Sequence, residues 1–167
     1  RAEISLERVS DKTYLQKYGF YSDQPYLDSG AKLEVFGQSS YVVADTHIFQ
    51  ELREATGVQS VPDGNILPNI RAAYQSEPLF GETYATFNGD ILGISGHDTS
   101  SQRFIGDMRL TTPWTLWGGN RLTASVSARY DLYHFDNTMM VDGSVYSGFK
   151  NRFLPSGYLE WGLPMYR

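Results

Sequence analysis

The sequence contains no cysteine, which excludes a thiol nucleophile, a thiolate zinc site and any disulfide within this stretch. No apolar run approaches the roughly 18 residues that a transmembrane helix needs. Lysine and arginine number 14 against 19 aspartates and glutamates, and the resulting net charge of −5 argues against nucleic acid as a partner. Helical periodicity is also nearly absent: one weak candidate at 49–55 is followed by Gly57 and Pro62. Long helices are therefore not expected.

The start of the chain also lacks the basic-then-apolar leader of an exported protein. Arg1 is followed directly by residues with a strand pattern. We therefore expect a piece of a longer chain, in which residues 1–167 form part of one domain and no second domain is present.

What the sequence does have is period-two alternation of apolar and polar residues, which predicts strands. The predicted strands are 1–9, 29–37, 40–52, 66–76, 81–95, 101–113, 119–134 and 156–165. The clearest alternation spans 121–134, where even positions such as Leu122 and Val126 are apolar and odd positions such as Arg129 are polar. This run exceeds the usual five or six residues of a soluble strand and reaches the roughly 9–11 residues of a tilted membrane strand.

The connections between the predicted strands alternate in length. Long connections are expected at 10–28, 53–65 and 135–155, a medium one at 96–100, and short ones at 38–39, 77–80 and 114–118. An up-and-down meander in an outer membrane has short periplasmic turns and longer external loops. The alternation therefore favours such a meander.

The two faces of the predicted strands differ in a way that favours a membrane barrel. The apolar face is rich in small residues, which would fill a close-packed core poorly but which fluid lipid tolerates: Ala2, Ala31, Ala44, Ala72, Ala85, Gly89, Gly93, Gly106, Ala124 and Ala128. The polar face carries charges of both signs, which suit a water-filled lumen: Lys32, Glu34, Asp45, Arg71, Asp90, Arg103, Asp107, Arg109, Arg129, Asp131 and Glu160. Aromatic residues near predicted strand ends agree with interfacial girdles: Trp114, Trp117, Tyr130, Tyr133 and Phe135.

The predicted fold class is therefore all-β, an antiparallel up-and-down transmembrane β-barrel of which this chain supplies about eight strands. A soluble β-sandwich that binds carbohydrate is the alternative from another class, because half-buried sandwich strands also alternate.

The residues that could carry chemistry form no catalytic constellation. His47, His97 and His134 are each assigned a plain polar or turn role, since no serine can be paired with them. Asp136, Asn137 and Asp142 match no calcium-loop spacing. Gly118, Gly119 and Asn120 join two alternating runs, which identifies a hairpin turn and no phosphate-binding loop. We predict no catalytic residue, no metal site and no cofactor, and hence a role in transport, binding or assembly.

Three stretches resemble, in this order, the barrel domain of the lipopolysaccharide-assembly family LptD, especially its alphaproteobacterial members. The first is Arg-Val-Ser-Asp-Lys-Thr-Tyr-Leu at 8–15, and the second is Leu-Pro-Asn-Ile-Arg-Ala-Ala-Tyr at 67–74. The third comprises Tyr-Ser-Gly-Phe at 146–149, Arg-Phe-Leu-Pro at 152–155 and Leu-Glu-Trp-Gly-Leu-Pro at 159–164.

The resemblance implies a large barrel in the outer membrane of a Gram-negative bacterium. Family members pass lipopolysaccharide (LPS) through the lumen and a lateral opening into the outer leaflet. They are plugged by the lipoprotein LptE and are fed by periplasmic bridge proteins. The family's periplasmic jellyroll, its disulfide cysteines and its first and last barrel strands have no counterpart here. No functional residue of the family can therefore be transferred to this sequence.

The residues themselves add one hypothesis about the lumen. Arg71, Arg103, Arg109 and Arg129 lie on the predicted lumenal face, and guanidinium groups suit phosphate. They are candidates for contact with LPS or with the plug lipoprotein. The alternative is that they pair with lumen carboxylates and only shape the barrel. A porin-like or substrate-uptake barrel is the alternative function among membrane proteins.

Overall fold

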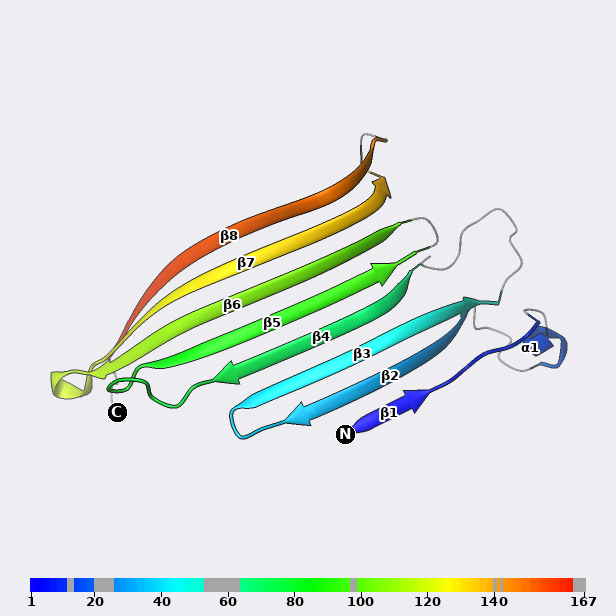
Figure 1. Ribbon diagram of the computed structural model, residues 1–167. Coiled ribbons are helices and arrows are strands. Elements are labelled where there is room, and N and C mark those ends of the chain that lie inside the picture. The colour runs from blue at the N-terminus through cyan, green and yellow to red at the C-terminus, as the bar shows by residue number, and fades with distance from the viewer. Residues whose placement is uncertain are drawn as a thin grey trace.

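In the computed structural model, the described residues are 1–11, 14–19, 26–52, 64–96, 99–139, 141 and 143–163. They form one antiparallel sheet of eight strands in sequence order (Figure 1). The strands are β1 (Ala2–Ser5), β2 (Tyr26–Phe36), β3 (Ser40–Glu51), β4 (Asn65–Gln75), β5 (Tyr84–Ser95), β6 (Ser100–Thr115), β7 (Arg121–Met139) and β8 (Val145–Gly162). A single helical turn, α1 (Tyr14–Lys17), and a 3₁₀ turn, η1 (Trp117–Gly119), complete the described elements.

The predicted all-β meander is confirmed, because each strand pairs antiparallel with the strand that precedes it. The sheet is open, with β1 and β8 at its edges, as expected for part of a larger barrel. The sandwich alternative is wrong, since the described residues form no second sheet that could cover this one. None of the helices in the described ranges has the length and apolar character that a membrane crossing requires.

The sheet has two ends that differ in their connections. The turn end carries the connections 37–39, 76–83 and 116–120, and the loop end carries 6–25, 52–64, 96–99 and 140–144. The predicted alternation of connection lengths holds only in the first half of the chain, because 76–83 at the turn end is longer than 96–99 at the loop end.

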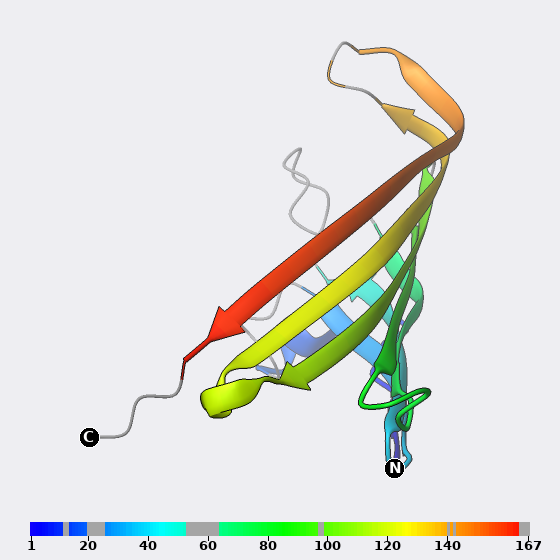
Figure 2. The same cartoon turned by 90° about the vertical axis from the view of Figure 1, so that its left-hand side faces the viewer.

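The predicted long loop at 135–155 is wrong. β7 continues to Met139 and β8 begins at Val145, so that Tyr133 pairs with Lys150 and Phe135 pairs with Gly148. The glycines and serines between 143 and 148 are typical of a loop, but the pairing with β7 holds Ser147 and Gly148 in a strand. Figure 2 shows the resulting β7–β8 hairpin, whose orange tip extends beyond the neighbouring strands.

The first predicted strand, 1–9, is shorter in the structure, because backbone pairing with β2 ends at Ser5. Beyond Ser5, two side chains form hydrogen bonds with the backbone of the chain in place of backbone pairing. The Ser29 hydroxyl accepts from the Glu7 amide at 3.0 Å and donates to its carbonyl at 2.8 Å. The Gln50 side chain binds the Val9 amide at 3.1 Å and carbonyl at 2.7 Å in the same way. Residues 6–9 thus stay attached to β2 and β3 without forming a strand.

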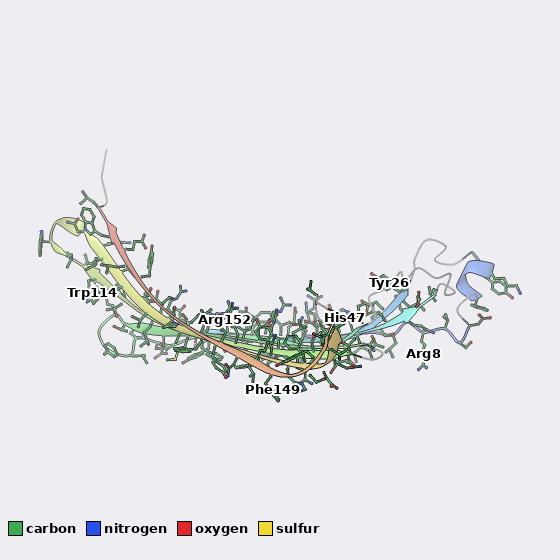
Figure 3. All side chains as sticks on the ribbon, turned by 90° about the horizontal axis from the view of Figure 1, so that it is seen from above. Arg8, Tyr26, His47, Trp114, Phe149 and Arg152 are labelled. Carbon is green, nitrogen blue, oxygen red and sulfur yellow. The ribbon has the colours of Figure 1, made fainter. Side chains whose placement is uncertain are left out.

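The sheet is curved, and alternation assigns the side chains to two faces. In Figure 3, Arg152 and His47 lie on the concave side and Phe149 lies on the convex side. Large apolar side chains of the convex face are uncovered: Met108 is 52% exposed, Val126 60% and Phe153 61%. Leu27 and Leu52 are the only large apolar side chains that are buried in the described part of the chain. A water-soluble domain of this size would bury a far larger core.

Strand β4 contains a bulge that depends on a glycine in the neighbouring strand. The register between β4 and β5 shifts between Ile66 and Asn69, and the extra residue brings the carbonyl of Leu67 against Gly93. A β-carbon at position 93 would lie 2.1 Å from the Leu67 oxygen, which is far inside van der Waals contact. The close approach of the two backbones therefore requires glycine at this position.

We expect Gly93→Val to destabilise the folded protein by about 1–3 kcal/mol, the usual cost of forcing atoms into an occupied site. Gly157→Val is the matched control, because a β-carbon at Gly157 meets nothing within 4 Å. The folded fraction can be measured from the heat-dependent shift in electrophoretic mobility of the membrane-extracted protein. Equal losses for the two variants would contradict the tight contact between β4 and β5.

Candidate functional site

The ionic concave face of β4–β8 is the candidate site. The registers align one row of residues across the sheet on this face: Arg71, Asp90, Ile105, Asp131 and Arg152. The next row towards the loop end contains Asn69, Leu92, Arg103, Tyr133 and Lys150. All four arginines predicted to face the lumen, Arg71, Arg103, Arg109 and Arg129, lie on this face by register.

Asp131 is the centre of the strongest ionic cluster. Its side chain is fully buried between two arginines. Arg129, two residues earlier on β7, donates from Nε to Oδ1 at 2.7 Å. Arg152, directly opposite on β8, donates to Oδ2 from Nη2 at 2.5 Å and from Nε at 3.1 Å. Both carboxylate oxygens therefore receive charge-assisted hydrogen bonds, and those from Arg152 connect β8 to β7.

Arg152 belongs to this site but was missed from the sequence, because it fell inside the predicted loop 135–155. A signal for it was present. Lys150, Arg152 and Leu154 alternate with Phe149, Asn151 and Phe153, and this alternation continues the pattern of a strand into the region assigned to a loop.

The other three predicted arginines differ in their partners. Arg103 donates to Asp90 on the neighbouring strand at 2.7 Å. Arg71 lies 3.7 Å from Asp45, which also accepts from the side-chain amide of Asn69 at 2.9 Å. Arg109 is exposed and has no ion pair or hydrogen bond within the described ranges. Pairing with carboxylates thus accounts for Arg71, Arg103 and Arg129 and leaves Arg109 available to a ligand.

Charge is distributed unevenly across the concave face. On β6–β8, cations outnumber carboxylates: Arg103, Arg109, Arg121, Arg129, Lys150 and Arg152 face only Asp107, Asp131 and Glu160. On β1–β3 the balance is reversed, with Glu3, Asp28, Glu34, Asp45 and Glu51 against Lys32. The chain carries a net charge of −5, yet its C-terminal strands present a basic surface to the concave side.

The acidic part of the face contains His47. Its Nδ1 lies 3.0 Å from a carboxylate oxygen of Asp28, and its Nε2 lies 3.7 Å from Asp45, the neighbour expected from the alternation. These groups line a shallow hollow together with Glu3, Lys32 and Arg71. Within the described ranges, no three histidine, cysteine or acidic side chains are grouped so that they could hold a metal ion.

The other residues considered for chemistry take structural positions or fall outside the structure described. His134 lies on the convex face, where its ring contacts Phe149 with centroids 4.4 Å apart. Asp136 accepts a hydrogen bond from the Ser147 hydroxyl at 3.2 Å, and the amide of Asn137 donates to the same hydroxyl at 2.8 Å. His97 and Asp142 lie outside the described residues.

Aromatic residues mark both ends of the convex face. Trp114, Leu122 and Trp161 form one row near the turn end, and Gln102, His134 and Phe149 form another near the loop end. Phe149 and Trp161 both lie on β8. A rise of about 3.4 Å per residue and a strand tilt of about 40° separate them by about 30 Å along the barrel axis. The height of the apolar band in outer-membrane barrels is comparable, about 25 Å.

The girdle predicted at the end of the seventh strand is wrong for three residues. Tyr130 lies in the middle of β7, because that strand continues to Met139. Tyr133 and Phe135 lie on the concave face by register, so they do not meet the medium on the convex side. Alternation from Arg129 and Asp131 already places Tyr133 and Phe135 on the polar face, so their composition as aromatic residues was given too much weight.

Comparison with known proteins identifies the family. The entire chain, residues 1–167, matches the family described as LptD, LPS transport system D. A search among curated proteins found no match. The family transports and assembles LPS and is not a family of enzymes. Because this match covers every residue and the strands form the open meander expected of a barrel wall, the chain belongs to the LptD family.

Proposed function

We propose that this chain is a section of the wall of an outer-membrane β-barrel that conducts LPS to the outer leaflet. One observation carries the proposal: the convex face is apolar, uncovered and bordered by aromatic rows, whereas the concave face is ionic. Acyl chains meet the first kind of surface, and a water-filled lumen meets the second. The loop end, which carries the two longest connections, then faces outwards and the turn end faces the periplasm.

The concave face would line a lumen that suits an amphiphile with a phosphorylated, sugar-rich head. Guanidinium groups bind phosphate through paired, charge-assisted hydrogen bonds. Arg109 is the foremost candidate for such contact, since the carboxylates near it leave it unpaired in the described part of the chain. Arg71 and Arg103 connect neighbouring strands, whereas Arg129 is bonded to Asp131 within β7.

The proposal includes the partners expected of such a barrel. A plug lipoprotein of the LptE type would occupy the lumen, periplasmic bridge proteins would deliver LPS at the turn end, and membrane lipid would surround the convex face. The resident compartment is the outer membrane of a Gram-negative bacterium, and nucleic acid is not a partner.

Photo-crosslinking in cells tests this function. We expect a photoreactive amino acid at position 109, 103 or 129 of the full-length protein to form an adduct with LPS or with the plug lipoprotein. With the probe at the neighbouring concave position 107, Arg109→Glu should lower the LPS adduct roughly tenfold, because one charge-assisted contact is replaced by repulsion. Arg109→Lys, which keeps the charge, is the control. No adduct with either partner from any of these positions would refute the proposal.

A further inference from the structure

Three aromatic side chains cluster on the concave face near the loop end of β7 and β8. The rings of Tyr133 and Phe135 are stacked, with centroids 6.1 Å apart and planes 2° from parallel. Tyr146 meets Phe135 edge-on, with centroids also 6.1 Å apart. Because they lie on the concave face, these rings do not belong to the aromatic rows that border the apolar band.

The backbone of β8 leaves room for this cluster. Phe135 pairs with Gly148, which has no side chain to compete with the rings. A β-carbon at Gly148 would lie 3.0 Å from the hydroxyl oxygen of Tyr146 and 3.3 Å from its Cζ. The Tyr146 hydroxyl donates to the Phe149 carbonyl at 3.2 Å, which holds the ring along the strand. The orientation of the Tyr146 ring is therefore determined by the strand beneath it.

Cations border the aromatic cluster. The Lys150 ammonium lies 4.7 Å from the centroid of the Tyr146 ring, and this lysine has no carboxylate partner in the described ranges. Arg152 shares the carboxylate of Asp131 with Arg129, so two guanidinium groups face one carboxylate. A shallow hollow lies between rings and cations, lined by Tyr133, Phe135, Lys150, Asn151 and Arg152.

We propose that Tyr133, Phe135, Tyr146, Lys150 and Arg152 form a binding site for a phosphorylated saccharide. The C–H faces of a pyranose ring pack against aromatic rings, and the tyrosine hydroxyls supply polar contacts at the rim. A phosphate group on the sugar is held by Lys150 and Arg152. The inference rests on the proposed function, since the saccharide is then the head of LPS on its way past the outer end of the lumen.

The combination of rings and excess positive charge favours this occupant over the others that such a surface could hold. A lipid tail would leave the cations without partners, and a neutral sugar would make no use of them. A protein segment needs depth or a sheet edge to bury its own backbone, and this hollow is shallow and lies on the face of the sheet.

Binding of core oligosaccharide to the purified full-length protein tests the inference. The probe is the phosphorylated core oligosaccharide freed of its acyl chains, and its enzymatically dephosphorylated form is the comparison. We expect Phe135→Ala to weaken binding of the phosphorylated form by about twofold to tenfold, the usual worth of one aromatic contact. Lys150→Gln should weaken it by roughly tenfold and should reduce the preference for the phosphorylated form, because Arg152 alone then holds the phosphate.

Phe149→Ala is the control, because it also removes a phenylalanine ring that contacts another ring, but from the convex face. Equal affinities of the Phe135→Ala and Phe149→Ala variants, or binding that ignores phosphate, would overturn the site. Should Phe135→Ala fail to fold, Lys150→Gln still decides, because its exposed side chain supports no buried contact. LPS adducts from position 109 without oligosaccharide binding here would reject this site and leave the proposed function standing.

Discussion

Replacing Ala128 with arginine is expected to cost about 2–4 kcal/mol of folding free energy, the cost of placing a cation on the lipid face at mid-membrane. Ala128 is an exposed residue of the convex face of β7, midway between the aromatic rows that contain Leu122 and His134. An arginine there cannot reach water without bending past half the thickness of the apolar band. The folded fraction should fall accordingly.

Ser127→Arg is the matched control, one residue away on the same strand. The Ser127 hydroxyl lies on the concave face, 2.6 Å from the hydroxyl of Ser156, where an arginine would meet water and neighbouring polar groups. We expect this variant to lose less than about 1 kcal/mol. The two variants can be compared by urea titration of the full-length protein in lipid vesicles. Equal losses of folding free energy for the two variants would show that both faces meet the same medium, and would refute the barrel interpretation.

Asp131→Ala should cause the largest loss of stability among substitutions on the concave face. The carboxylate receives hydrogen bonds from Arg129 and Arg152, and without it two guanidinium groups face each other across β7 and β8. We expect the ratio of folded to unfolded protein to fall on the order of tenfold or more, because two charge-assisted bonds are lost and repulsion is added.

Asp107→Ala separates this effect from a general loss of negative charge. Asp107 lies on the same face of the neighbouring strand, opposite Arg129, but it makes no hydrogen bond or ion pair in the described part of the chain. Its removal should leave the folded fraction nearly unchanged. In the Arg129→Ala background, Asp131→Ala should cost less than in the wild type, since one of the two facing cations is gone. A double-mutant cycle with no coupling would argue against the cluster.

The strands could be predicted from the sequence wherever apolar and polar residues alternate without interruption. Along 121–134 every second residue is apolar, and the structure places this run within β7 with its two faces as expected. At 143–148 the glycines and serines obscured the pattern, and a strand was mistaken for a loop. Local composition fails there because pairing with a long neighbouring strand holds residues extended that would not be extended alone.

The candidate site was predictable in part for the same reason. Arg71, Arg103, Arg109 and Arg129 could be assigned to the polar face, because alternation along each strand is enough for that. Which of them would be paired could not be predicted, since Arg103 meets Asp90 and Arg129 shares Asp131 with Arg152 only through the registers between strands. The aromatic cluster was also missed, because Phe135 and Tyr146 are brought together by the β7–β8 hairpin.

The alternation of apolar and polar residues in the sequence was enough to determine that this protein forms long strands with one apolar and one ionic face. Successive side chains of an extended backbone point in opposite directions, so alternate residues share a face. Only the tertiary structure decided which residues of neighbouring strands stand opposite one another, where the pairing of β7 and β8 ends, and which way the sheet curves. Those features depend on hydrogen bonds between strands distant in sequence, and a shift of one residue would exchange the two faces of a strand.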